Sequence, residues 1–408
     1  MCVGPDLEIT TGDDGTVDII FFQDQEMKLF FESYPELMLL DATYKLTNVR
    51  MTLYVMLCVG PNGESEIVAV FFTPFEDCRT LSAALELFKA RNPNWCKVRT
   101  VMTDKDMAER DALRSKLPQA SLLLCLFHVL RAIGREVTTS KMSITEPVRT
   151  SALHLFQAIA YATTEQQYTD LHDKLHATMP PSVVRYYETN WHPCRFEWVL
   201  CWQRQNVTFG ERTNNRLESV NRRLKAVIKP GSSLPVFFTD LIATIKCMHH
   251  ERDQCFVKTL EKVSIDPFPL GSVEGKYASS VTSFALQFIV KQLKLSDSTD
   301  VTVEDDHAAA TVLIDGVSTE VTPDECPCPF WKSMGLPCQH VFAIRHHLQL
   351  QIFSLSGIWP RWLKNSVADK HRLFHKPEDN AEPVVNVSHH VSKPLTQSQK
   401  FHHCKRVV

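Results

Sequence analysis

The sequence of 408 residues lacks an excess of basic residues, a long apolar run and an N-terminal secretory pattern. Its 44 Lys and Arg stand against 47 Asp and Glu, so any binding of nucleic acid must depend on a local patch of charge. The apolar run Ser121-Leu-Leu-Leu-Cys125 is far too short to cross a bilayer. The first residues show no charged start followed by an apolar stretch, so we expect a protein that is not secreted.

The cysteine pattern indicates reduced thiols. There are 13 cysteines, an odd number, and several lie in apolar stretches: Cys58, Cys125, Cys201 and Cys247. This favours an intracellular compartment over a disulfide framework. The composition, 44% hydrophobic and 22% charged, is that of an ordinary globular protein with a sizeable core.

The hydrophobic pattern predicts an α/β fold. Residues 37–124 read as β-β-β-α-β-α-β, with the first three strands antiparallel. The second and third strands are joined through Pro61-Asn62-Gly63, a hairpin signal because Asn-Gly tolerates positive φ. Residues 127–253 are helical almost throughout. A mixed sheet covered by helices is the natural packing of these elements.

This pattern divides the chain into four regions. We expect a strand-and-helix lead-in at 1–35, an α/β domain at 36–255 with a helical insertion at about 128–212, a helix and small metal module at 256–350 with its core at 310–350, and an extension at 351–408 that is disordered from about 376. One helix is expected at about 277–295, followed by two short strands within 301–314.

The segment before residue 341 carries a metal-ligand pattern. Cys326, Cys328, Cys338 and His340 provide three thiolates and one imidazole, a tetrahedral set that Zn²⁺ prefers. The alternative is four unrelated residues, which the regular spacing disfavours. Because no fifth ligand interrupts the set, the pattern predicts a closed, structural zinc site.

Three acidic residues stand where a hydrolytic site could use them. Asp41 and Asp104 end two predicted strands, and Glu218 lies on a later helix. Strand ends deliver their side chains to one edge of a sheet, so the two aspartates are expected to meet there. Converging carboxylates repel one another and favour hard cations such as Mg²⁺ or Mn²⁺.

The helix that carries Glu218 is locally basic and suits contact with phosphate. Its cationic residues are the candidate nucleic-acid contacts: Arg216, Arg222, Arg223, Lys225 and Lys229. The alternative is a solvated amphipathic helix with ordinary salt bridges, which the spacing alone favours.

Four motifs together resemble the Mutator-like (MULE) transposase domain, in the right order and over about residues 35–250. They are Leu40-Asp-Ala-Thr-Tyr-Lys45, Met102-Thr-Asp-Lys-Asp106, Cys125-Leu-Phe-His128 and Thr213-Asn-Asn-Arg-Leu-Glu-Ser-Val-Asn221. The downstream Cys-x-Cys-x₉-Cys-x-His pattern resembles the SWIM zinc finger. The nearest group is that of the animal SWIM zinc-finger proteins, which resemble transposases taken over by their hosts.

The resemblance implies an RNase H-like fold with a helical insertion, a SWIM-type zinc module and a nuclear location. It assigns Asp41, Asp104 and Glu218 to the catalytic acidic triad of the family. Cys125 and His128 match the family's Cys-x-x-His signature; the local alternative is a buried cysteine and a histidine at a helix start. Family transposases carry a DNA-binding module ahead of this domain, and the 35 residues here are too few for one, so we expect a truncated chain or one without autonomous transposition.

Three functions remain open from the sequence. The first is a zinc-binding nuclear protein whose SWIM finger contacts DNA or a protein partner, with the transposase-type domain as a scaffold. The second is an active DDE-type transposase that cleaves and joins DNA strands with Mg²⁺ or Mn²⁺. The third is a protein-interaction scaffold without nucleic-acid binding. The missing DNA-binding module favours the first.

Overall fold

A computed structural model describes residues 7–12, 15–44, 51–229, 231–261, 268–269, 271–299, 301–303, 310–314, 317–374 and 385–389. The strands are β1 (Leu7–Thr11), β2 (Val17–Phe22), β3 (Leu37–Thr43), β4 (Thr52–Val59), β5 (Ser65–Thr73), β6 (Thr100–Thr103), β7 (Ser121–Leu124), β8 (Val301–Val303), β9 (Ala310–Ile314), β10 (Val317–Val321) and β11 (Val385–His389). Within these ranges, no helix combines the length and apolar character needed to span a membrane.

The helices fall into three groups along the chain. Those of the first half are α1 (Gln25–Ser33), α2 (Cys78–Arg91), α3 (Met107–Lys116), α4 (Leu126–Glu136), α5 (Thr139–Met142), α6 (Glu146–Ala160), α7 (Glu165–Thr178), α8 (Pro181–Asn190) and α9 (Leu200–Gln203). The later ones are α10 (Asn215–Val227), α11 (Leu234–Glu261), α12 (Val273–Ser280), α13 (Ser283–Ser296), α14 (Pro329–Met334), α15 (Gln339–His347) and α16 (Lys364–Lys370). Short 3₁₀ helices occupy Pro93–Lys97, Arg195–Glu197, Pro360–Trp362 and Arg372–Phe374.

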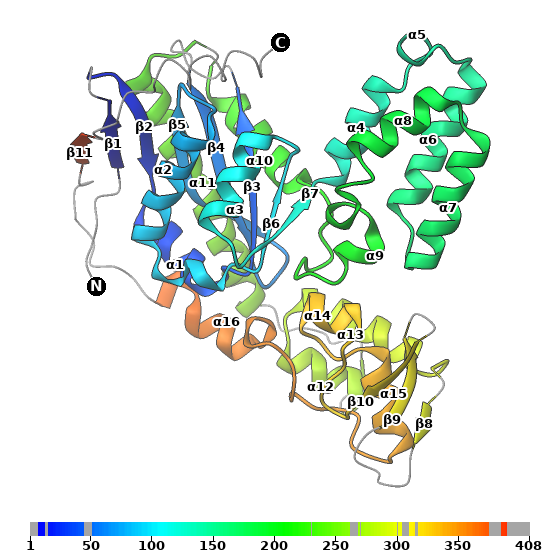
Figure 1. Ribbon diagram of the computed structural model, residues 1–408. Helices are drawn as coiled ribbons and strands as arrows, with labels where there is room; N and C mark the ends of the chain where they lie inside the picture. Colours follow the sequence, from blue (N-terminus) through cyan, green and yellow to red (C-terminus); the bar gives the residue numbers. More distant parts are fainter. Residues whose placement is uncertain are drawn as a thin grey trace.

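The central sheet has the strand order β11-β1-β2-β5-β4-β3-β6-β7 (Figure 1). Strands β3, β6 and β7 are parallel, whereas β3, β4, β5 and β2 pair antiparallel in turn. The expected hairpin joins β4 to β5, with Gly63 at φ +77°. The lead-in strand β2 belongs to this same sheet instead of standing apart from it.

Both faces of the sheet are covered, because side chains alternate along each strand. On β4, Leu53, Val55, Leu57 and Val59 join a core with α10 and α11, whereas Tyr54, Met56 and Cys58 join a core with α1, α2 and α3. The mixed α/β sheet covered by helices is therefore confirmed.

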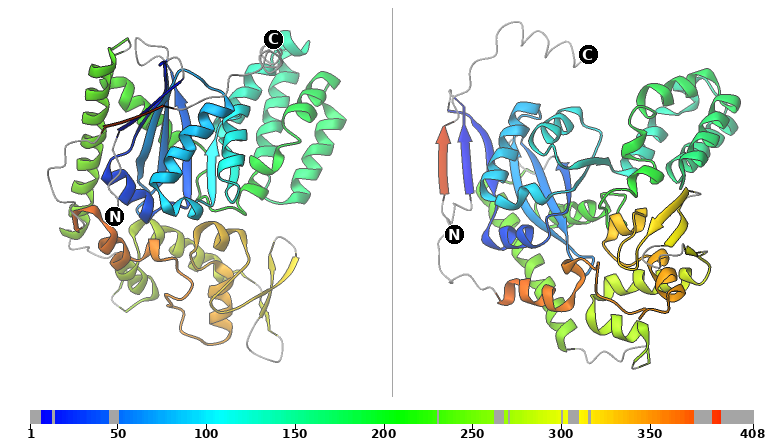
Figure 2. Two further views of the ribbon diagram at one scale, coloured as in Figure 1. Left: turned by 60° about the vertical axis from the view of Figure 1, so that its left-hand side comes forward. Right: turned by 60° about the horizontal axis from the view of Figure 1, so that its bottom comes forward.

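Two further units adjoin the sheet (Figures 1 and 2). Helices α4 to α9 form a bundle with its own core, around Phe156, Tyr187 and Trp198, which is the expected helical insertion. Its ends meet, since the Leu126 N–H donates to the Arg212 carbonyl at 2.9 Å. Strands β8 to β10 and helices α12 to α15 form the second unit, beyond one end of the sheet.

Three details differ from the sequence expectations. The helix expected at 277–295 is broken into α12 and α13, because Val281 bridges to Leu363 and Thr282 caps α13 by accepting from the Ala285 N–H. Strands β1 and β10 were not expected. Within the tail expected to be disordered, residues 385–389 form β11, which pairs parallel with β1; residues 375–384 and 390–408 lie outside the described part.

Candidate functional site

The strand register brings the first two acidic residues to one level of the sheet. On the parallel strands β3 and β6, Leu39 is the partner of Met102, so Asp41 and Asp104 lie level, two residues further on. Asp104 follows β6 directly, as expected, whereas Asp41 lies inside β3 instead of ending it. The carboxyl edge of the sheet therefore holds both residues.

His128 links the third acidic residue to this edge. It lies in the first turn of α4, just after β7, and its Nδ1 is 2.5 Å from Oδ1 of Asp104. Its Nε2 is 3.5 Å from Oε1 of Glu218 on α10. Asp41 accepts a hydrogen bond from Nδ2 of Asn221, also on α10, at 3.0 Å. Glu218 and Asn221 of α10 thus face the site, so this helix is not merely a solvated amphipathic one.

The charges at this edge are strongly coupled. Burial and the neighbouring Asp104 raise the pKa of Asp41 to about 7, and only His128 and a backbone hydrogen bond oppose them. Hydrogen bonds to Asp104 and Cys125 raise the pKa of His128 to about 10. The imidazolium therefore offsets negative charge that three carboxylates would otherwise leave uncompensated.

The Cys-x-x-His signature has a definite place in this site. Cys125 is fully buried and caps the start of α4, and its Sγ accepts from the Asn214 N–H at 3.1 Å. His128 makes the two contacts just described. The sequence left the role of this pair open, and only the contact between α4 and α10 shows that both residues join the acidic site.

Three carboxylates lie around His128, and carboxylates are the ligand type that a hard cation prefers. Among the described residues, however, the ligand atoms at this edge that all lie within 4.8 Å of one another belong to Asp104, Cys125 and His128, not to the three acidic residues. In this arrangement, two of the three carboxylates already contact His128. A divalent cation shared by Asp104 and Glu218 requires the imidazole to move away from one of them.

The four expected zinc ligands converge in the second unit. The three Sγ atoms and a ring nitrogen of His340 all lie within 4.8 Å of one another, and the four residues are buried. Nδ1 of His340 is 3.6 Å from Sγ of Cys326 and of Cys338. Metal bonds of about 2.3 Å to sulfur and about 2.0 Å to nitrogen place tetrahedral ligands roughly 3.5 Å apart. This Cys₃His cluster could therefore hold a structural zinc ion.

Local structure fixes the cluster. Cys328 begins α14 and Cys338 precedes α15, and the Trp331 N–H points at Sγ of Cys328, at 3.4 Å. Gly335 turns the chain between the helices at φ +60°, where a Cβ atom would lie 2.1 Å from the Trp359 ring. Hydrogen bonds from its neighbours lower the pKa of the Cys328 thiol, while burial raises that of Cys338. Three adjacent thiolates need a cation to coexist.

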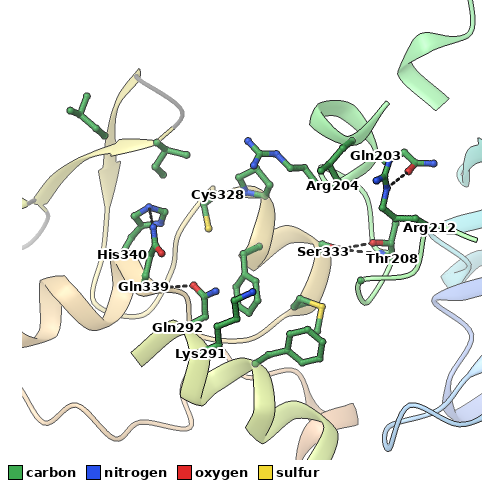
Figure 3. A pocket seen from close by; sticks show the side chains of 18 residues that line it. Gln203, Arg204, Thr208, Arg212, Lys291, Gln292, Cys328, Ser333, Gln339 and His340 are labelled. Atoms are coloured by element: carbon green, nitrogen blue, oxygen red, sulfur yellow. Dashed lines mark hydrogen bonds between the residues drawn. The ribbon is translucent and has the colours of Figure 1, made fainter. Parts of the chain in front are cut away.

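A cavity of about 560 Å³ lies between the insertion and the Cys₃His cluster (Figure 3). Two members of the cluster line it. On one side the Thr208 hydroxyl lies 3.0 Å from that of Ser333, and on the other the Gln339 N–H donates to Gln292 at 2.8 Å. The segment between α9 and α10 and the unit that carries the Cys₃His cluster thus meet around this cavity.

Comparisons with known proteins agree with this architecture. A family model for the RNase H-like domain of zinc finger SWIM domain-containing protein 1/3 matches residues 4–123. Residues 4–123 are thus an RNase H-like domain, similar to the one in that family. The chain is 20% identical to Protein FAR1-RELATED SEQUENCE 11 of Arabidopsis thaliana over 380 residues, which cover 91% of this chain and 54% of that protein.

Two further relatives extend the comparison. The transposase for insertion sequence element IS1201 of Lactobacillus helveticus is 24% identical over 212 residues, 48% of this chain and 52% of that protein. The uncharacterized protein ZSWIM9 of Homo sapiens is 26% identical over 192 residues, 46% of this chain and 30% of that protein. The chain thus spans about half the length of the first two relatives. Its similarity to these proteins and to the SWIM family model is consistent with derivation from a MULE transposase.

The basic helix, α10, is only partly available to a ligand. Arg216 donates to the Gly63 carbonyl and pairs with Glu211, and Arg223 pairs with Glu251 at 2.7 Å. The remaining candidates are exposed and have no ion pair within the described residues: Arg222, Lys225 and Lys229. Contact with nucleic acid stays a prediction for these three.

The raised pKa of Asp41 gives a testable pH dependence. The Asp41 carboxyl ionises near pH 3.8 in the unfolded chain and near pH 7 in the fold. Its contribution to the free energy of unfolding is therefore complete below pH 3.8 and is lost as the pH rises through 7. Asp41→Asn should change stability little near pH 4.5 and raise the free energy of unfolding by about 2–4 kcal/mol at pH 8.5. Urea unfolding without Mg²⁺ or Mn²⁺ measures this difference. An equal effect at both pH values would contradict it, and exposed Asp111→Asn is the control.

Replacing Cys338 with Ser tests the Cys₃His cluster. The variant should lose one zinc per chain, and amide exchange should quicken in residues 317–347, because three cysteines belong to the small core of this unit. Metal analysis and hydrogen exchange provide the two measurements. The exposed Cys255→Ser should keep its zinc, and full metal content in Cys338→Ser would refute the assignment.

Proposed function

We propose that the protein is a zinc-binding nuclear protein, derived from a MULE transposase, that contacts the phosphate backbone of DNA. The single observation that carries this proposal is the stripe of three exposed cations beside the acidic site. Arg222 and Lys225 lie one turn apart on α10, and Lys229 follows within the next turn of chain. No acidic partner neutralises them within the described residues, so they are available to phosphate groups.

The acidic site favours a scaffold role for the RNase H-like domain. Asp104 and Glu218 both contact His128, and Asp41 is held by Asn221. These contacts stabilise the edge of the sheet without any bound substrate. The Cys₃His unit, joined to the domain around the cavity, would supply a second contact with DNA or with a protein partner. The nuclear location follows from the family resemblance, and imaging of a fluorescent fusion tests it.

Changing the stripe should weaken DNA binding and reduce its dependence on salt. The triple variant Arg222→Gln, Lys225→Gln, Lys229→Gln should lower the slope of log K against log[salt] by about 3, since each phosphate contact contributes about 0.9. Titration of labelled duplex DNA at several salt concentrations measures the slope.

Arg223→Gln is the matched control, because Arg223 is exposed on the same helix but already paired with Glu251. It should leave the slope nearly unchanged. An unaltered slope in the triple variant, or no binding by the wild type, would reject contact through α10 and favour a protein-interaction scaffold.

A second candidate function is metal-dependent strand cleavage, which the position of Asp104 and Glu218 on either side of His128, with Asp41 level with Asp104, favours. When bound, Mg²⁺ or Mn²⁺ would act as a Lewis acid on a phosphodiester. Asp41, Asp104 and Glu218 would hold the cation, and His128 would have to release at least one of them.

A nicking assay decides between the two. If the protein is an enzyme, wild type should nick supercoiled DNA in Mn²⁺ and Asp41→Asn should not, because one cation ligand is lost. Asp111→Asn, on the exposed face of α3, should nick like wild type. Equal nicking by wild type and Asp41→Asn would point to a contaminant and leave the scaffold role in place.

A further inference from the structure

The helical insertion contains a second cluster of metal-type ligands, far along the chain from the sites already described. His172 and His176 lie one turn apart on α7, and both direct their Nε2 atoms at Oε1 of Glu188 on α8, at 2.7 and 3.0 Å. The three ligand atoms lie within 4.8 Å of one another. Helices α7 and α8 are neighbours in the bundle (Figure 1).

The geometry suits a borderline divalent cation. Two imidazoles and one carboxylate form a set found in open zinc sites, with water in the fourth position. Metal bonds of about 2.0–2.2 Å at tetrahedral angles separate the ligands by roughly 3.3 Å. The observed 2.7 and 3.0 Å contacts therefore need to open by only about half an ångström, which small side-chain rotations provide.

The surroundings hold these imidazoles in place. The His192 ring stacks on His172 with centroids 4.6 Å apart, and Nδ1 of His192 lies 2.7 Å from the Tyr168 hydroxyl. Because His192 stacks flat against His172, it serves as an outer support and not as a fourth ligand. His176 is about half exposed, so the cluster is open to solvent and a cation can enter.

We propose that His172, His176 and Glu188 form a second metal site, which binds Zn²⁺ and links α7 to α8. The site is separate from the Cys₃His cluster and from the acidic edge of the sheet. Loss of either of those sites leaves it unaffected, so its test is independent of the proposed function.

Zinc content of the full chain, measured in zinc-buffered solution, tests the proposal. Wild type should bind two zinc ions per chain, and His176→Ala and Cys338→Ser should each bind one. The matched control is His154→Ala, an exposed histidine on α6 of the same bundle, which should keep both. Circular dichroism confirms that the variants are folded.

Two further measurements identify the ligands. Cobalt substitution should give thiolate charge-transfer bands for the Cys₃His cluster alone, and these should persist in His176→Ala. Glu188→Gln should weaken zinc at the second site by at least about tenfold, since even an outer-sphere partner of a metal ligand is worth 10–100-fold in affinity. An equal zinc content in wild type and His176→Ala, or unchanged affinity in Glu188→Gln, would each overturn the proposal.

Discussion

Negative charge at the carboxyl edge of the sheet is the constraint around which the RNase H-like domain is arranged. Asp41 and Asp104 lie level on adjacent parallel strands, and Glu218 approaches from α10. Such a group is unfavourable unless a cation lies among its members. His128 supplies one from within the chain, and it is carried by the helix that begins where β7 ends. The fold therefore depends on α4 and α10 reaching the same edge.

The junction between the sheet and the Cys₃His unit relies on a buried cation, Arg361. Arg361 is 2% exposed, and its guanidinium pairs with Glu36 at 2.6 Å, donates to the Val59 carbonyl and stacks on Phe209 at 3.7 Å. These partners come from three separate segments. Removing one partner of such a buried ion pair lowers the free energy of unfolding by about 3–5 kcal/mol, because the charge of the other partner is left uncompensated. The neighbouring Trp362 side chain donates to the Met334 carbonyl of α14 at 2.6 Å, so the 3₁₀ helix that carries Arg361 joins the Cys₃His unit to the domain.

Much of this arrangement could be predicted because its signals are local. The Asn62-Gly63 hairpin, the strand before Asp104 and the Cys-x-Cys and Cys-x-His pairs depend on residues close in sequence. The role of His128 could not be predicted, since it depends on how α4 meets α10 across the whole insertion. The break between α12 and α13 depends on Leu363, and β11 depends on β1 at the other end of the chain. Such long-range pairing leaves no periodic signal.

The insertion can carry a site of its own because its ends are joined. The Leu126 N–H meets the Arg212 carbonyl, and the Arg212 side chain donates to the carbonyls of Ala160 and Trp198. Closing so long a segment costs little more than closing a short one. The start of α4 and helix α10 therefore keep their places at the acidic edge, whether or not the rest of the bundle binds a ligand. A ligand bound at His172 and Glu188 would stiffen the bundle. Its effect could reach the sheet through this joint, through the Arg110–Glu197 ion pair at 2.7 Å, and through Gln203, which donates to the Leu124 carbonyl at 3.0 Å.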